Sequence, residues 1–189
     1  MEVNDIYKEL PVIETKRLTL RKLTQQDLET MFLYCSDEEV AKYVLWDRHQ
    51  SLKDTKEFMD YALTQYEKGE IAPWGMERKG TNHLIGTIDF VQWNPKHQTA
   101  EIGYVLARDQ WGNGLITEAA LELIRFGFEK MELVRIQAKC FEENTASARV
   151  MEKIGMAYEG TFRQAMKVKG KHRNLKVYSI LKEEYEKGK

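Results

Sequence analysis

The sequence lacks the features by which several protein classes are recognised. Its 189 residues include two cysteines and four histidines, and neither set has the spacing of a metal or redox site. We therefore expect no metal, and we expect Cys35 and Cys140 to be free thiols in a reducing compartment. No apolar run approaches a membrane span, and the charged N-terminus does not resemble a signal peptide. The expected location is the cytoplasm.

A strong charge imbalance is also absent. The formal net charge is −1, with 31% charged and 42% hydrophobic residues, which is ordinary for a soluble globular protein. This balance gives no global reason to expect a membrane partner or direct binding to nucleic acid. The length favours a single domain over residues 1–189 and leaves monomer and homodimer both open.

The rest of the chain is organised around one stretch, residues 104–121, with the sequence YVLARDQWGNGLITEAAL. An apolar run that ends at Leu106 predicts a strand, and helical spacing from about Leu115 predicts a helix. The turn between them is Trp111-Gly112-Asn113-Gly114. Glycines allow close backbone approach, and the first amides of a helix have no partner within it. This arrangement suits a phosphate or pyrophosphate.

Two common phosphate motifs do not fit this stretch. A P-loop needs Gly-Lys-Ser/Thr, which is absent, and a dinucleotide fingerprint needs a third glycine where Thr117 stands. An alternative without any ligand is a plain tight connection between strand and helix.

The run WGNGLITEA resembles the coenzyme A loop of the GNAT acetyltransferase superfamily, in particular the RimJ/RimL-type branch, which acetylates protein N-terminal amines. The superfamily pattern is Gln/Arg-x-x-Gly-x-Gly/Ala. Trp111 takes the first position, as is usual in that branch, and Gly114 takes the fourth. Ile116 departs from the small residue expected last. The resemblance implies an acetyl-coenzyme A site that includes Leu106, Trp111, Gly112, Asn113, Gly114, Leu115 and Thr117.

Two further stretches extend the resemblance over nearly the whole chain. Residues 14–21, ETKRLTLR, match the usual start of RimJ/RimL-type proteins. Residues 144–147, NTAS, precede residues 152–155, EKIG, as in the GNAT pattern Asn-x-x-Ser/Ala followed by Glu-Lys-Ile/Leu-Gly-Phe. From the residues alone, Asn144 is equally an ordinary helix N-cap, Ser147 a first-turn serine and Gly155 a helix-ending glycine.

The resemblance gives these residues roles. It implies that Asn144 contacts the pantetheine arm and that Ser147 lies near the thioester sulfur. Many relatives have a tyrosine four residues after the serine as the general acid. Met151 stands there and has no proton to give, so Ser147 or an ordered water must supply one.

Glu101 is the candidate general base. It begins Glu-Ile-Gly-Tyr, the tetrad that precedes the loop in RimJ/RimL-type sequences. Strand alternation places Glu101 and Gly103 on one face and Tyr104 and Leu106 on the other, unless a strand bulge, common in the family, shifts them. The alternative is a solvated charge on a half-exposed strand.

The reaction sets modest demands. A neutral amine attacks the thioester carbonyl, and backbone amides near Leu106 could stabilise the oxygen that gains charge. At pH 7 roughly one α-amine in ten is neutral, against roughly one lysine in 2,500, so a weakly activated site suits N-terminal amines. Acidic residues outnumber basic ones nine to four between Asp27 and Asp60, whereas residues 163–182 hold seven Lys/Arg and no acid. The first set could attract a cationic amine and the second could touch phosphates or ribosomal RNA, but solvated surfaces explain both equally well.

Periodicity and capping signals predict the order of elements. We expect a strand at residues 12–23 and three helices with caps at Thr24, Ser36 and Ser51. A hairpin of residues 71–77 and 83–93 follows, then a strand at 99–106 and a helix from 115 to about 130. The remaining elements are a strand at 133–140, a short helix at 144–154, and strands at 157–168 and 173–181. This is a single-domain α/β (α+β), GNAT-like fold with a mixed, largely antiparallel sheet flanked by helices.

The expected function is that of an acetyl-coenzyme A-dependent N-acetyltransferase. It would move an acetyl group to a primary amine, with a ribosomal or other protein N-terminal α-amine as the favoured acceptor, by direct attack on the thioester. One alternative is an acetyltransferase for a small amine such as a polyamine or an antibiotic, which shares every motif. Another is a non-catalytic coenzyme A-binding sensor, which Met151 and Ile116 keep open.

Overall fold

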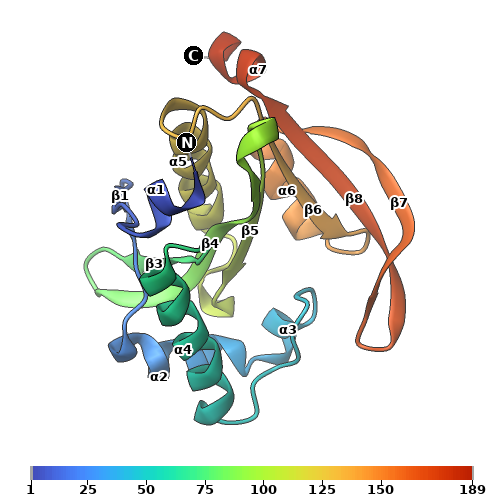
Figure 1. The fold of residues 1–189 in the computed structure, drawn as a ribbon. Coiled ribbons are helices and arrows are strands. Elements are labelled where there is room, and N and C mark those ends of the chain that lie inside the picture. The colour runs from blue at the N-terminus through green and yellow to red at the C-terminus, as the bar shows by residue number, and fades with distance from the viewer. Residues whose placement is uncertain (1, 189) are drawn as a thin grey trace.

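The computed structural model describes residues 2–188, which form one eight-stranded sheet with helices on both sides (Figure 1). The strand order is β1-β2-β3-β4-β5-β6-β8-β7, and neighbours are antiparallel except β5 and β6, which are parallel. The predicted α/β class and mixed, largely antiparallel sheet are therefore confirmed. The strands are β1 (Ile13–Glu14), β2 (Leu18–Arg21), β3 (Trp74–Arg78), β4 (His83–Asn94), β5 (Thr99–Leu106), β6 (Arg135–Phe141), β7 (Ala157–Val168) and β8 (Lys171–Leu181).

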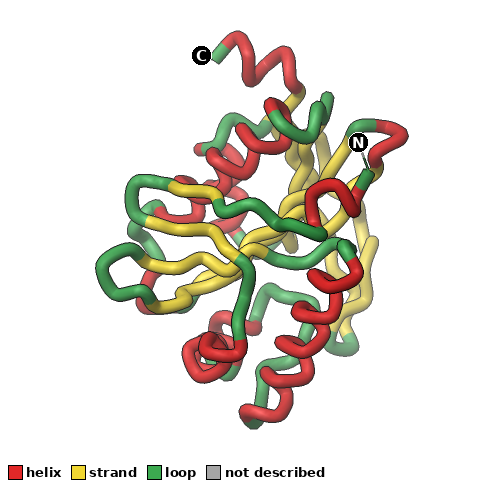
Figure 2. The backbone as a smooth tube through the Cα atoms, turned by 60° about the vertical axis from the view of Figure 1, so that its left-hand side comes forward, coloured by secondary structure: helices red, strands yellow, loops and turns green. Residues whose placement is uncertain are grey.

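Helix α5 covers one face of the sheet, and α2 and α4 lie on the other (Figures 1 and 2). Gly127 of α5 fits closely against the sheet, because a Cβ built there would lie 2.8 Å from Ile136 Cδ1 and 3.1 Å from Phe90 Cζ. The α-helices in the described part are α1 (Val3–Tyr7), α2 (Leu28–Cys35), α3 (Glu38–Ala41), α4 (Leu52–Lys68), α5 (Leu115–Glu129), α6 (Thr145–Lys153) and α7 (Lys182–Lys187). None of these helices is long and apolar enough to cross a bilayer.

Large side chains fill the space between α5 and the sheet. Trp74 of β3 and Phe90 of β4 are fully buried, and their rings meet edge to face. The Trp74 ring makes a second edge-to-face contact, with Phe126 of α5. Such edge-to-face aromatic pairs add to the gain from burying apolar surface. This core holds the carboxyl-terminal part of α5 against β3, β4 and β6.

The sheet separates between β5 and β6. Their parallel ladder runs from Thr99 opposite Arg135 to Ile102 opposite Ala138 and then ends. Beyond it β5 continues to Leu106 against β4, and β6 continues to Phe141 against β8. We call this divergence the split. Ala107 N–H donates to Ile85 O, so strand alternation directs the amides of Tyr104 and Leu106 away from β4, toward the split.

Most sequence-based element boundaries agree with the structure, including the strand at 99–106 and the helix that begins at Leu115. The predicted strand at 12–23 is wrong, because Thr15 turns the chain and produces the antiparallel pair β1 and β2. The cap of α3 is Asp37, which accepts the Glu39 amide, and not Ser36. The terminal helices α1 and α7 were not predicted. The capping boxes at Thr24 and Ser51 are confirmed, although a 3₁₀ turn, Gln25–Asp27, precedes α2.

Candidate active site

The loop between β5 and α5 presents backbone amides. Gly112 and Gly114 have φ of 76° and 73°, in the left-handed region that only glycine adopts without strain. Gly114 is the N-cap of α5 and provides no side-chain acceptor for the first-turn amides. Those amides and the positive end of a 15-residue helix favour an anion at this point. The structure therefore gives residues 111–114 the geometry that a phosphate requires.

Side chains hold this loop in place from two directions. Trp111 Nε1 donates to Leu106 O at 2.8 Å, which ties the start of the loop to the end of β5. Arg17 Nη1 donates to Asn113 O at 2.9 Å, and Arg17 Nε pairs with Glu118 Oε2 at 2.6 Å. Burial alone would raise the pKa of Glu118, but hydrogen bonds from Thr15 and Arg17 hold it below its usual value. The first turn of α5 is thus fixed and its carboxylate neutralised.

Ile116, the departure from the small residue of the family pattern, is not in conflict with ligand approach. Its side chain is 8% exposed and packs in the core beside Leu115. Thr117 is partly exposed at the first turn of α5. The side chain at 116 therefore faces away from the exposed backbone of the loop.

Helix α6 places Asn144 and Ser147 on the other side of the split. Asn144 caps the helix by accepting the Ser147 amide at 3.1 Å, so its side-chain oxygen has the ordinary capping role as well as any contact with a ligand. Ser147 Oγ lies 2.9 Å from Tyr104 Oη, which makes a hydrogen bond across the split from β5 to α6. Burial raises the pKa of Tyr104 well above its usual value, so its hydroxyl keeps its proton.

Met151 is 1% exposed and lies in the core, so position 151 offers no group to a substrate. The hydroxyl that meets Ser147 comes instead from Tyr104, on the strand opposite. Sequence reasoning missed this pairing because residues 43 apart in sequence make it. Cys140 and Cys35 are both free and buried.

Glu101 connects the two strands just before they diverge. Its Oε2 pairs with Lys139 Nζ at 2.6 Å and accepts from Gln137 Nε2 at 2.9 Å, and both partners lie on β6. The side chain is 13% exposed, so the alternative of a solvated surface charge is wrong. The predicted alternation of β5 holds, since the bulge lies in β4, between Phe90 and Gln92. Whether Glu101 acts as a base stays a prediction, and its carboxylate is already occupied.

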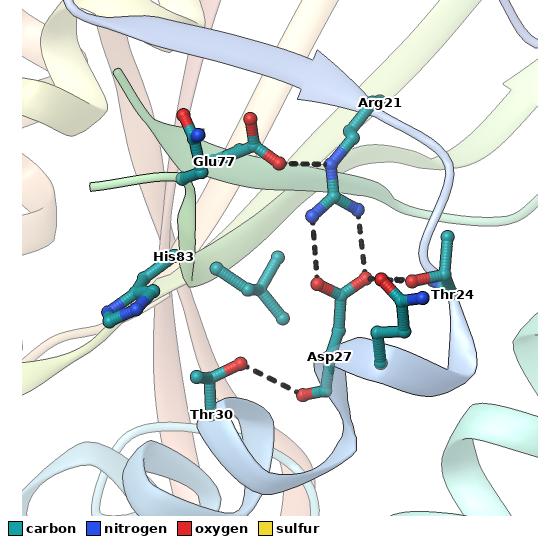
Figure 3. A pocket seen from close by; sticks show the side chains of 9 residues that line it. Arg21, Thr24, Asp27, Thr30, Glu77 and His83 are labelled. Carbon is teal, nitrogen blue, oxygen red and sulfur yellow. Dashed lines mark hydrogen bonds and ion pairs between the residues drawn. The ribbon is translucent and has the colours of Figure 1, made fainter. Parts of the chain in front are cut away.

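A charged pocket at the far end of the sheet has a different character. Arg21 donates to both oxygens of Asp27 at 2.8 Å and pairs with Glu77 at 2.6 Å (Figure 3). Burial opposes ionisation of Asp27, but the hydrogen bonds from Arg21 and Thr24 lower its pKa below the usual value. Arg21 thus engages both carboxylates of this network, which joins β2 and β3 to the start of α2.

The β7–β8 hairpin reaches α3. Lys169 Nζ donates to Ala41 O at 2.5 Å, and Tyr43 packs against Phe141, Val168 and Leu175. Part of the acidic stretch has structural roles, since Asp27 is paired with Arg21 and Asp37 and Asp54 cap helices. Within residues 2–188 no group of His, Cys, Asp or Glu side chains is arranged to hold a metal ion.

Comparison with protein families identifies this architecture. The model described as acetyltransferase (GNAT) domain matches residues 17–157. The N-acetyltransferase YoaA of Bacillus subtilis, itself uncharacterised, is 37% identical over 172 residues, which cover 91% of this chain and 97% of YoaA. A solved GNAT-family acetyltransferase from Bacillus anthracis is 34% identical with a TM-score of 0.82, covering 92% of this chain and 99% of its own.

Two more distant relatives have named acceptors. The ribosomal-protein-serine acetyltransferase of Escherichia coli is 29% identical, covering 87% of this chain and 93% of the relative. The spermidine N(1)-acetyltransferase of the same organism is 22% identical, covering 88% of this chain and 87% of the relative.

Proposed function

Because the chain belongs to the GNAT acetyltransferase family and is an N-acetyltransferase, we propose that it transfers the acetyl group of acetyl-coenzyme A to a protein N-terminal α-amine. The observation that carries this proposal is the split. It has a loop of free amides at the end of β5 and a capped helix with a hydroxyl pair at the end of β6.

The residues present fit acetyl-coenzyme A. Gly112 has no atom within 4 Å of a built Cβ, so a diphosphate can approach the loop backbone there. Residues 111–117 would hold the diphosphate, and Asn144 would contact the pantetheine arm. The amides of Tyr104 and Leu106 point into the split, where a strand partner is missing. They are the donors available to a pantetheine amide or to the thioester oxygen.

The hydroxyl pair suits the leaving thiolate. As the amine nitrogen bonds to the acetyl carbon, the C–S bond breaks and sulfur takes the electron pair. Ser147 would then donate its proton to sulfur and recover one from Tyr104, whose proton is retained at neutral pH. This supplies the acid that Met151 lacks.

The choice of an α-amine rests on chemistry and on relatives. Because Glu101 is occupied by Lys139 and Gln137, the site offers limited activation from that residue, and α-amines need less than lysine. The ribosomal-protein-serine relative supports a protein N-terminus. The spermidine relative favours a second candidate, a small polyamine.

Coenzyme A release, followed by a free-thiol reagent, tests the proposal. The acceptors are a peptide blocked at lysine, the same peptide blocked at its α-amine, and spermidine. We expect turnover with the first peptide. If spermidine were the one acceptor that is acetylated, the proposed protein acceptor would be wrong and a polyamine would take its place. Acetyl-coenzyme A binding without turnover on any amine would leave a non-catalytic sensor.

A further inference from the structure

Asp89 is a carboxylate that no motif singles out. It lies in the middle of β4, opposite Gly103 of β5, on the face that also carries Glu101. Gly103 is the first residue of β5 beyond the ladder with β6. A Cβ built on Gly103 would lie 2.6 Å from Val91 Cγ1 and 3.6 Å from Asp89 Oδ1, so the missing side chain lets both β4 residues lie close to the β5 backbone where the split begins.

The Asp89 carboxylate has no partner among residues 2–188. No hydrogen-bond donor or cation meets it, and burial is the one cause of its altered acidity, raising its pKa to about 7. The residue nevertheless keeps partial exposure to solvent. A desolvated carboxylate is costly to bury unless a cation or donor compensates it. No described residue supplies such a cation or donor to Asp89, and a ligand can reach this side chain from the solvent.

The groups around Asp89 leave it free for a ligand. Tyr66 of α4 interacts with it electrostatically, but its hydroxyl donates to Pro73 O and accepts from Leu23 N–H. Tyr7 of α1 also lies within electrostatic range, and its hydroxyl has no partner among the described residues. On the same sheet face Glu101 is engaged by Lys139. No fixed positive charge is therefore committed to Asp89.

We propose that Asp89 receives the acceptor's ammonium group and removes the proton that must leave before attack, an inference that rests on the proposed function. Tyr104 and Ser147 lie on the α5 side of the split, and Asp89 lies on the α2–α4 side. A thioester in the split would then have an acid at its sulfur on one side and a base for the amine on the other. The acceptor class is a primary amine that arrives as a cation.

The proton balance is simple. The ammonium gives one proton to the Asp89 carboxylate and becomes a neutral amine, which bonds to the acetyl carbon. The nitrogen then loses a second proton to solvent water as the C–S bond breaks. Sulfur leaves with the electron pair and takes one proton from Ser147, which completes the thiol; Tyr104 reprotonates Ser147 and regains its own proton from solvent. Asp89 releases its proton to solvent and is ready for the next ammonium.

Asp89 is better suited to this role than Glu101. Glu101 is two residues further from the loop along β5 than Gly103, about 7 Å of strand, and it lines a pocket at the starting halves of β5 and β6. A base works best when its pKa lies near the working pH, which matches a carboxyl group that titrates at about 7. Glu101 instead joins β5 to β6 where they begin to diverge.

The variant Asp89→Asn tests the proposal, since it keeps the shape and removes the basicity. Near neutral pH we expect kcat/KM for the acceptor to fall on the order of 10²-fold, with acetyl-coenzyme A affinity unchanged. In the native protein the acid limb of kcat/KM should follow Asp89, near pH 7. In the variant it should follow the acceptor, at about 8 for an α-amine and about 10.4 for a lysine side chain.

Two comparison variants complete this experiment. Glu132→Gln removes an exposed carboxylate in the turn after α5 and should leave the profile unchanged. Glu101→Gln should keep the acid limb of the kcat/KM profile where the native protein has it, because Asp89 is still present. The assignment would be overturned if Asp89→Asn kept the native kcat/KM and the native acid limb of its pH profile. It would also be overturned if only Glu101→Gln lost that acid limb. Native protein that acetylates no amine at all would instead overturn the proposed function.

A stability measurement tests Asp89 without any substrate. The folded-state pKa lies above the usual 3.8, so the folded protein holds this proton more tightly than the unfolded chain. The stabilisation is present below about pH 4 and is lost as the pH rises through about 7. The Tm of the native protein should therefore fall more than that of Asp89→Asn between about pH 5.5 and 8. Parallel Tm curves would mean that Asp89 is already paired or solvated, which contradicts the proposal.

Discussion

The two sides of the split, which we propose to bind the cofactor and the acceptor, offer different kinds of group to a ligand. On the cofactor side, the donors are backbone amides of a glycine loop, and the side chains Arg17, Trp111 and Glu118 only hold that loop. On the proposed acceptor side, the group offered is the carboxylate of Asp89, which no cation matches, whereas Glu101 beside it and Asp27 at the far end of the sheet are both paired with cations. The comparison indicates that the paired carboxylates support the fold, and the unpaired one is the group that we assign to the substrate.

The largest effect should come from removing the cation of the matched network. Arg21→Met leaves Asp27 and Glu77 uncompensated, and we expect a loss of about 3 kcal/mol or more in the free energy of unfolding at neutral pH, measured in urea. The pKa of Asp27 is lowered in the folded state, so its contribution is present above the usual value of 3.8 and is lost as the pH falls through the lower folded value. The difference between the native protein and Arg21→Met should therefore narrow in acid.

A control separates this network from surface pairs. Lys56→Met removes the cation of an exposed i,i+4 pair with Asp60 and should cost under about 1 kcal/mol. If both variants lost the same stability, the distinction between the matched network and ordinary surface charge would fail. Folded Arg21→Met should still bind acetyl-coenzyme A normally, because the network lies outside the cofactor side.

The next effect concerns the loop. Gly114→Pro demands a φ near −65° where the loop has 73°, so the first-turn amides of α5 should be displaced. We expect acetyl-coenzyme A affinity to fall at least about a hundredfold by calorimetry, equal to about 2.7 kcal/mol. Gly80→Pro makes the same change at a left-handed glycine of the β3–β4 turn, with φ of 91°, and should leave affinity intact. Native affinity in folded Gly114→Pro would remove the loop from the binding site.

A smaller effect is expected at the hydroxyl pair. Ser147→Ala should lower kcat about tenfold with little change in acetyl-coenzyme A affinity, because a proton is needed only as the thiolate leaves. Tyr104→Phe should act in the same direction and less strongly, since Ser147 keeps its own hydroxyl. Rapid kinetics with one peptide acceptor and binding by calorimetry give the two quantities. Equal losses in both would assign Ser147 to cofactor binding.

The smallest effect should come from the loop anchor. Trp111→Phe removes one hydrogen bond to Leu106 O and keeps most of the ring, so affinity for acetyl-coenzyme A should weaken about two- to tenfold. Trp46→Phe, outside the loop, is the matched substitution and should have no effect on affinity. An unchanged Trp111→Phe protein would show that the backbone holds the loop unaided.

The local structure of the proposed cofactor side could be predicted because its signals are local. Gly112, Gly114 and the helix that follows are contiguous, and Asn144 caps α6 from the adjacent position. Arg17 and Glu118 escaped prediction because their pairing joins residues 101 apart. Asp89 was not predicted as a candidate because its position relative to the split depends on strand register, which the sequence does not show. Only the pairing with Gly103 places it beside the split.

Smaller errors have the same origin. The alternating pattern at residues 12–23 gives no sign that Thr15 would accept the Leu18 amide and reverse the chain. Glu101 was singled out by its motif, but the Lys139 and Gln137 that occupy it lie on a strand whose alignment the pattern does not contain. Periodicity predicts which face a residue occupies, and only the folded sheet determines its neighbours.

The short ladder between β5 and β6 also governs the cohesion of the whole molecule. Four residue pairs join the block β1–β5 to the block β6–β8 within the sheet. Further connections include α5, α6, the side-chain contacts of Glu101 with β6 and the contacts of Lys169 and Tyr43. A pantetheine arm that lies in the split and accepts hydrogen bonds from the Tyr104 and Leu106 amides would continue the pairing along β5 as an additional strand does. Cofactor affinity and the cooperativity of unfolding then both depend on this one interaction. We therefore expect unfolding to be more cooperative with acetyl-coenzyme A bound than without it.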